Sequence, residues 1–217
     1  MVKKIFTFLS ACFDVARYSI DGWIYRHELI PFFRDKKETI ALQVEWFDKG
    51  GVGEVIFSLA KNIEHEGTLR PVVFVVSDRK GYLEKVARRQ GLRVVVLGKN
   101  VLTLRWFIRI LRIRLANLHY ATFGADEYVK AKVPIVYTIH NTYIWADPSF
   151  VDRWSEEFSH VSKFIAVSSN VSAFFSRRFK IDPSRIITIA NGLNVDSITS
   201  DKVFHRRSFD LDDSRFG

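Results

Sequence analysis

The feature that most constrains the fold is a regular alternation of short apolar segments with stretches of helical periodicity. The segment "PVVFVV" (71–76) is too short for a helix, and its unbroken apolar character is typical of a strand covered on both faces. Six further segments alternate with helical patterns in the same way. The seven expected strands are residues 39–47, 71–76, 93–97, 116–121, 134–139, 163–167 and 185–190. This order predicts a Rossmann-like α/β fold, in which a doubly wound and mostly parallel sheet carries helices on both faces.

The same pattern divides the chain into three parts. It occupies residues 38–198, which we expect to form one Rossmann-like domain, because a single core commonly grows to about 150 to 250 residues. Residues 1–37 are rich in aromatic side chains and show no strand pattern, so we expect them to form a helical extension. Residues 199–217 are expected to be a tail or linker.

The beginning of the chain allows two interpretations. Leu9-Ser10-Ala11-Cys12 resembles a lipoprotein processing box, but the apolar run 5–13 is short for a signal sequence and is interrupted by polar residues. No uncharged apolar run approaches the ~20 residues that span a bilayer. Cys12 is the only cysteine, which excludes an internal disulfide and a multi-cysteine zinc site and fits a reducing compartment. The sequence therefore favours a cytoplasmic location, and any role of Cys12 stays open.

The charge balance indicates partners with negative charge. Lysine and arginine outnumber aspartate and glutamate by 33 to 24, which gives a formal net charge of +9. Such a protein is drawn to lipid head groups, nucleic acid or nucleotides. A non-catalytic α/β module that binds nucleic acid or a protein partner is therefore one candidate function. We find no recognition-helix, RNA-stacking or zinc signature, so nucleic acid is the less favoured partner.

A glycine-rich loop, "DKGGVGEV" (48–55), follows the first expected strand. It lacks the Gly-Lys-Ser/Thr ending of a phosphate-binding P-loop and the GxGxxG spacing of a dinucleotide-binding fingerprint. Two interpretations remain: a tight turn between strand and helix, or a loop whose backbone approaches a ligand at Gly50, Gly51 and Gly53.

Polar residues follow several of the other strands. Because ligands of doubly wound sheets bind at the carboxyl ends of the strands, residues just after strands are candidates for a site. One histidine is usually structural, but two at strand ends opposite a glycine loop favour a functional site. Ser168 is also expected to cap the next helix. The candidates are His119, His140, Asn141, Ser168, Asn191 and Gly192.

Three segments carry a resemblance to a known family. They are "GGVGEVIFSLAKNI" (50–63), "IVYTIHNTY" (135–143) and "FIAVSSNVSAFFSRRFKIDPSRIITIANGLNVDSI" (164–198). Together they resemble the amino-terminal half of a family 4 glycosyltransferase of the GT-B fold, over roughly residues 39–198. The most specific part is the ending "IANGLNVD", which is similar to the family's Asn-Gly-hydrophobic-Asn/Asp sequence.

The resemblance implies an acceptor-side domain of a retaining glycosyltransferase. Such an enzyme transfers a sugar from a nucleotide-sugar donor to a hydroxyl acceptor, a glycan or a lipid-linked molecule, as in polysaccharide biosynthesis. The resemblance implies no metal and no other cofactor. It places the glycine loop in the cleft between two Rossmann-like domains and His119 near the acceptor. His140 matches the first residue of a His-Asp pair, here His-Asn, and is the expected catalytic residue.

The resemblance also implies a second domain. In this family the donor domain carries a Glu-x7-Glu pair, and no two glutamates of this chain have that spacing. Stabilising a leaving nucleoside diphosphate requires cations or helix ends in a closed site, which one domain does not supply. We therefore expect the isolated chain to be folded but nearly inactive, and to need a donor domain or a partner subunit.

One basic segment points to a membrane surface. In "LTLRWFIRILRIRL" (102–115), an expected helix, Arg105, Arg109 and Arg112 share one face and Trp106 lies among apolar residues. Such a helix suits an anionic membrane, and peripheral attachment at its inner face would follow. The alternative is a helix that covers the sheet with a solvated arginine stripe. The sequence leaves both interpretations open.

Overall fold

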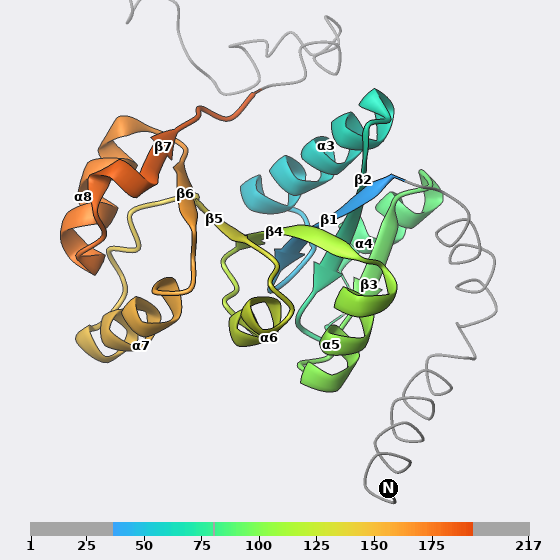
Figure 1. Cartoon of the computed structure of the whole chain (residues 1–217). Helices are drawn as coiled ribbons and strands as arrows, with labels where there is room; N and C mark the ends of the chain where they lie inside the picture. Colours follow the sequence, from blue (N-terminus) through green and yellow to red (C-terminus); the bar gives the residue numbers. More distant parts are fainter. Residues whose placement is uncertain (1–36, 80, 193–217) are drawn as a thin grey trace, which may run out of the picture.

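The seven strands of the sheet all run parallel, in the order β3-β2-β1-β4-β5-β6-β7 (Figure 1). The computed structural model describes residues 37–79 and 81–192. The expected helical extension, except its last residue Lys37, therefore lies outside the described residues, as do Cys12 and the expected tail 199–217. The strands are β1 (Glu38–Val44), β2 (Leu69–Val75), β3 (Arg93–Val96), β4 (Ile113–His119), β5 (Ile135–Ile139), β6 (Lys163–Ala166) and β7 (Ile186–Thr188). The predicted Rossmann-like fold with seven strands is confirmed.

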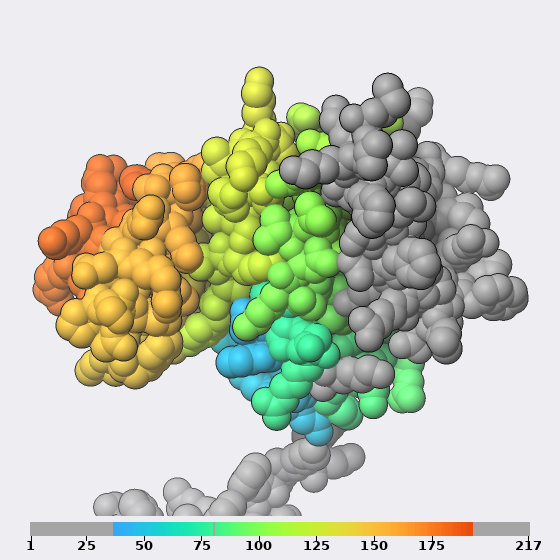
Figure 2. Space-filling view, turned by 90° about the horizontal axis from the view of Figure 1, so that it is seen from below, coloured from blue at the N-terminus to red at the C-terminus, as the bar shows by residue number. Residues whose placement is uncertain are grey.

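Helices connect the strands, as the alternating sequence pattern predicts. They are α3 (Gly51–Glu66), α4 (Tyr82–Arg89), α5 (Val101–Ile110), α6 (Ala125–Lys130), α7 (Pro148–Phe158) and α8 (Ser169–Phe179), with a short 3-10 helix at Pro183–Arg185 before β7. Figure 2 shows the face covered by α5, α6 and α7, which lie in a row from green to orange. Among the described helices, none is long and apolar enough to cross a bilayer.

The strand order reverses between β1 and β4. The chain proceeds outward from β1 through β2 to β3, and then returns to place β4 on the other side of β1. Val44, the last residue of β1, lies opposite Val75 of β2 and opposite His119 of β4. In open α/β sheets the crevice for ligands lies at the carboxyl edge where the order reverses. The fold therefore places the segments after β1 and β4 beside that crevice.

Apolar cores cover both faces of the sheet. On one face, Leu42 and Val73 pack with Ile56 of α3 and Leu83 of α4. On the other face, the core includes Phe74 of β2 together with α5, α6, α7 and α8. Because successive side chains of a strand point to opposite faces, β2 supplies apolar residues to both cores. This explains the unbroken apolar run that predicted the strand.

An aromatic cluster fixes the loop between β5 and α7. Tyr143, in that loop, is fully buried and makes ring contacts with Trp154 of α7 and Phe175 of α8. Its hydroxyl lies 3.2 Å from the hydroxyl of Tyr137 in β5. Aromatic pairs add about 0.5 to 1.5 kcal/mol each beyond the area that they bury. The loop that begins with His140 is thus anchored to the core three residues later.

The prediction of a helix over residues 102–115 is wrong at its carboxyl end. Helix α5 ends at Ile110, and β4 spans Ile113–His119, earlier than the expected strand 116–121. Between them Arg112 has a left-handed backbone with φ 50. From Ile113 the chain is extended, because this strand pairs with β1. Arg112 therefore does not share a helical face with Arg105.

Candidate functional site

A cleft of about 990 Å³ lies at the carboxyl edge of the sheet, where the strand order reverses. The loop after β1 forms one wall and the loop after β4 forms another. The third wall comes from the loop after β5 and from α7. The lining includes Trp46, Lys49, Gly50, Gly51, Gly53, Arg79, Lys99, Tyr120, Phe123, Trp145, Phe150, Arg153 and Trp154. Of the site residues expected from the sequence, the three glycines line this cleft.

The three glycines of the loop have different structural roles. Gly50 precedes α3 with φ 148, a conformation that side chains rarely adopt. A Cβ atom on Gly53 would lie 2.1 Å from the carbonyl oxygen of Asp48, so no side chain fits there. A Cβ atom on Gly51 would meet no described atom within 4 Å. Gly50 and Gly53 thus allow the turn, whereas Gly51 is open to the cleft.

The loop also presents the amino-terminal end of α3. The first amides of a helix have no partner within the helix, and they lie at the positive end of its dipole. Among the described residues, no side chain caps this end at Gly50. The start of α3 therefore faces the cleft with free hydrogen-bond donors, an arrangement that suits an anionic ligand.

Asp48 ties the glycine loop to the start of α4. Its Oδ1 accepts hydrogen bonds from the backbone N–H of Tyr82 and of Lys49, each at 2.8 Å. The bond from Tyr82, followed by that from Lys49, lowers the pKa of the Asp48 carboxyl. A Cβ atom on Gly81 would lie 1.9 Å from the carbonyl oxygen of Phe47, so the two loops pack backbone against backbone. The sequence analysis missed this link, because no local pattern joins positions 34 residues apart.

Two histidines meet behind the cleft. Nδ1 of His119, at the end of β4, lies 2.8 Å from Nε2 of His140, just after β5. Burial, with a smaller contribution from His140, holds the pKa of His119 well below its usual value. Burial also lowers the pKa of His140 to about 4. Both rings are therefore neutral at pH 7, and one ring nitrogen donates its proton to the other.

The expected substrate contact of His119 requires correction. Its side chain is 1% exposed, so it does not reach the cleft. Among the described residues, its other ring nitrogen, Nε2, has no hydrogen-bond partner. Its polar contact is to His140, which is half-buried. His119 thus supports His140 from within the core.

Tyr120 connects the histidine pair to the cleft. Its ring stacks on that of His140 with an interplanar angle of 8° and a centroid distance of 5.8 Å. The side-chain amide of Asn141 donates a hydrogen bond to the Tyr120 hydroxyl, and its oxygen accepts one from the backbone N–H of Tyr143 at 2.7 Å. Tyr120 lines the cleft and was missed by the sequence analysis, although its place directly after His119 is a usable signal.

The remaining expected residues lie farther along the same edge. Ser168 Oγ accepts a hydrogen bond from the Val171 N–H at 3.2 Å, so it caps α8 as predicted. Asn191 and Gly192 are exposed and follow β7, which β5 and β6 separate from β4. Neighbouring strands lie about 4.8 Å apart, so these two residues are on the order of 10 Å or more from the histidine pair. The described structure does not bring them to the cleft, and their role in binding stays a prediction.

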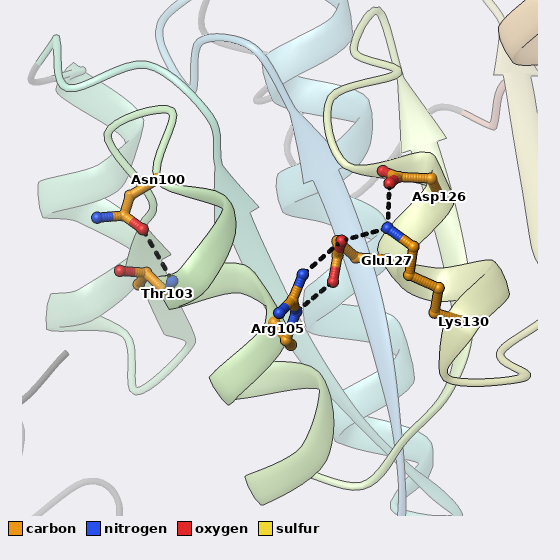
Figure 3. Close-up of polar contacts among 6 residues, drawn as sticks. All are labelled: Asn100, Thr103, Arg105, Asp126, Glu127 and Lys130. Carbon is orange, nitrogen blue, oxygen red and sulfur yellow. Dashed lines mark hydrogen bonds and ion pairs between the residues drawn. The ribbon is translucent and has the colours of Figure 1, made fainter. Parts of the chain in front are cut away.

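The expected arginine stripe on α5 is also corrected, because Arg105 is engaged within the protein. Figure 3 shows its guanidinium turned toward Glu127 of α6, with Nε to Oε2 at 2.5 Å and Nη2 to Oε1 at 2.9 Å. Lys130 adds a bond to Glu127 and one to Asp126. Trp106 is half-buried and packs against the apolar core that α5, α6, α7 and α8 form with the sheet. Arg105 and Trp106 therefore bind α5 to the protein.

Acidic side chains also line the cleft, at Glu45, Asp48 and Glu157. Within the described parts of the chain, no group of three or more His, Cys, Asp or Glu side chains is placed to hold a metal ion. Of the three acidic residues in the cleft wall, Asp48 uses one oxygen for the two backbone amides described above, and Glu45 pairs with Lys99.

The fold and this cleft define a class: a Rossmann-like domain with its ligand crevice at the carboxyl edge of the sheet. The family model described as Glycosyltransferase Family 4 matches residues 49–197. The chain therefore belongs to that family, as its sequence resemblance predicted. A search among curated protein sequences gave no match.

Solved structures share the fold. Alr3699/HepE from Anabaena in complex with UDP-glucose has 17% identity and a TM-score of 0.64 over 79% of this chain and 49% of that chain. A glycosyltransferase from Rickettsia africae has 19% identity and a TM-score of 0.62 over 82% and 51%. S. aureus MnaA with UDP has 15% identity and a TM-score of 0.53 over 71% and 44%. The chain thus spans about half the length of these proteins, and the predicted half of a GT-B fold is confirmed.

Proposed function

We propose that this chain is the acceptor-side domain of a retaining glycosyltransferase. In the two-domain enzyme it would transfer a sugar from a nucleotide-sugar donor to a hydroxyl acceptor. The observation that carries this proposal is the cleft between the glycine loop and Tyr120, whose ring stacks on that of His140, at the reversal of strand order. The UDP-glucose complex of the Anabaena protein supports a nucleotide sugar as the donor. Family membership favours this function over that of a non-catalytic basic binding module.

His140 is the proposed catalytic residue. Because its pKa is lowered to about 4, it acts as a neutral hydrogen-bonding group and not as a cation. A neutral imidazole can orient a sugar hydroxyl, or share its proton, as the glycosidic bond to the donor breaks. The negative charge on the leaving diphosphate then needs other stabilisation. The start of α3 supplies part of it, and the donor domain supplies the rest.

The lining of the cleft suggests the chemistry of the acceptor. Trp46 and Trp145 are 57% and 58% exposed in its wall. Flat aromatic rings offer a large, rigid surface against which the apolar C–H face of a sugar ring packs. Charged side chains of both signs surround them, with Lys99 paired to Glu45 at 3.4 Å and Arg79 and Arg153 also in the wall. This combination suits a glycan or a lipid-linked acceptor.

The donor is proposed to be selected mainly by a second domain. The isolated chain is proposed to be nearly inactive, to work without a metal, and to act in the cytoplasm, at the inner face of the membrane if the acceptor is lipid-linked. The donor domain would be joined in the same polypeptide or brought by a partner subunit.

The test uses the complete enzyme, formed with its donor domain, and a panel of nucleotide sugars. We expect turnover with at least one donor, product with the donor's anomeric configuration by NMR, and about a hundredfold lower turnover for His140→Ala. Asn170→Ala, an exposed position on α8, serves as the control. Inversion of configuration would refute the mechanism, and unchanged turnover of His140→Ala would refute the role of that residue.

A further inference from the structure

A second hollow, of about 1180 Å³, lies at the opposite, amino-terminal edge of the sheet. Its walls are the first residues of β1, β2 and β4 and the last turns of α5 and α6. Figure 2 views the molecule from the side on which α5 and α6 lie next to each other. The glycosyl-transfer cleft is at the other end of the strands. The two hollows are therefore separate sites.

Positive charge dominates this cavity. Among the described residues, its lining has seven arginine or lysine side chains and two glutamates. The cations are Lys37, Arg70, Arg105, Arg109, Arg112, Arg114 and Lys130, and the glutamates are Glu38 and Glu127. The carboxyl ends of two helices, each equivalent to about half a negative charge, offset only part of this excess.

Some of these cations are neutralised within the protein. Arg105 and Lys130 both bind Glu127, which is 3% exposed. Arg114 lies 3.2 Å from Glu38. Lys37 and Arg70 also make interactions of their own. Within residues 37–79 and 81–192, Arg109 and Arg112 have no carboxylate partner. Both are exposed at the rim of the cavity.

The local backbone structure does not require an arginine at position 109 or at position 112. Arg112 has φ 50, a left-handed conformation that glycine or asparagine adopts more easily and that is unfavourable for other residues. Its backbone N–H bonds to the Arg109 carbonyl at 3.2 Å, so the turn uses the backbone of Arg112 and not its side chain. Arg109 complements the end of α5, but a lysine or histidine there would do the same. The guanidinium groups are therefore available to a ligand.

We propose that this cavity binds a phosphate-bearing group through Arg109 and Arg112, with Arg114 beside them. The planar guanidinium donates two parallel hydrogen bonds to phosphate oxygens, which a lysine does not. A concave wall directs several cations at one ligand and partly excludes water, which strengthens each attraction. The phosphate could belong to a free diphosphate or to the head group of an anionic lipid. This inference does not depend on the proposed glycosyl transfer.

The experiment compares two double variants of the full chain. R109Q/R112Q removes the two rim charges, and K85Q/R89Q removes two exposed charges from α4, on the other face of the sheet. Inorganic pyrophosphate is titrated by calorimetry. Vesicles of phosphatidylcholine, with and without phosphatidylglycerol, are tested by co-sedimentation. Circular dichroism confirms that both variants are folded.

The parent is expected to bind at least one of the two anionic probes. R109Q/R112Q should bind it about tenfold more weakly or worse, whereas K85Q/R89Q should match the parent within about twofold. Binding of pyrophosphate identifies a free diphosphate ligand, and binding only of phosphatidylglycerol vesicles identifies a lipid head group. Equal losses in both double variants would show a general effect of net charge and overturn the site. Absence of binding by the parent to either probe would also overturn it.

Discussion

Nδ1 of His119 lies 2.8 Å from Nε2 of His140, so the proton of one imidazole is fixed by the other. The two rings come from neighbouring strands, β4 and β5, and only the second approaches the protein surface. The buried ring therefore decides which nitrogen of His140 carries its proton and how that ring is oriented.

The first prediction concerns this control of His140. His119→Ala should lower the turnover of the complete enzyme about tenfold to a hundredfold with little change in KM, because the ring of His140 loses its hydrogen-bond partner. His119→Gln, which retains a hydrogen-bonding group, should recover part of that turnover. Steady-state kinetics of both variants, at a temperature where melting curves show them folded, provides the measurement. If His119→Ala turned over as fast as the parent, the positioning role would be wrong.

The second prediction is a loss of stability in mild acid. Burial lowers the pKa of His140 from 6.5 to about 4, and His119 shifts in the same direction. The unfolded chain thus binds more protons than the folded chain between these values, and the free energy of unfolding falls as the pH drops from about 6.5 to 4. For His140 the loss is at most about 3 kcal/mol. Urea unfolding of the chain at pH 7, 5.5 and 4.5 measures it.

The matched control for this pH effect is His140→Gln. Its free energy of unfolding should vary less between pH 7 and 4.5 than that of the parent, since one of the two titrating rings is absent. A parent whose stability was constant over this range would contradict the buried neutral pair.

The third prediction concerns the ion pairs of Glu127. Glu127→Gln should reduce the free energy of unfolding by about 1 to 3 kcal/mol, because a buried carboxylate that holds Arg105 and Lys130 is lost. The exposed pair of Asp126 and Lys130 provides the comparison, and Asp126→Asn should cost less than about 1 kcal/mol. Chemical denaturation of both variants at pH 7 measures the two losses of unfolding free energy.

The pH dependence of the Glu127 contribution is distinct from that of the histidines. The hydrogen bond from Arg105 is the main cause that lowers the Glu127 pKa from 4.5 to about 2. Its stabilisation is therefore complete above about pH 4.5 and is lost as the pH falls toward 2. Equal stabilities of Glu127→Gln and the parent at pH 7 would show that the ion pairs contribute nothing.

The fourth prediction separates the two roles of the glycine loop. Gly53→Ala should destabilise the chain by several kcal/mol, since its methyl group would overlap the Asp48 carbonyl and the Leu83 side chain. Gly51→Ala meets no described atom and should leave the melting temperature within a few degrees of the parent. In the complete enzyme, Gly51→Ala should raise KM, because the added methyl group would separate the ligand from the backbone of the loop. Unchanged kinetics of Gly51→Ala would support a turn and nothing more.

Local patterns predicted most of the fold. Strands β1, β2 and β5 are each runs of apolar or β-branched residues, which is the local pattern of a strand. Ser168 is a residue type that favours the start of a helix, and it caps α8 in the structure. The end of α5 could not be predicted in the same way. Its arginines recur at spacings that fit a helix, while the residues from Ile113 onward also fit a strand, and only pairing with β1 decides between them.

The sequence predicted which edge of the sheet carries the site, but it did not predict the contacts between the residues of the site. Strand ends indicate which side of the sheet carries His119 and His140, because parallel strands finish together. They do not show that His119 is buried, since that depends on what the helices cover. The bond from Tyr82 to Asp48 likewise joins two different loops, and no periodicity reports it.

The carboxylate of Asp48 has a mechanical consequence. One oxygen of this carboxylate accepts hydrogen bonds from the backbone N–H groups of Lys49 and Tyr82, which couples the glycine loop to α4. In addition, Nζ of Lys49 lies 4.2 Å from the centre of the Tyr82 ring. A ligand that shifts the loop at Asp48 therefore also acts on the start of α4, through the hydrogen bond from Tyr82.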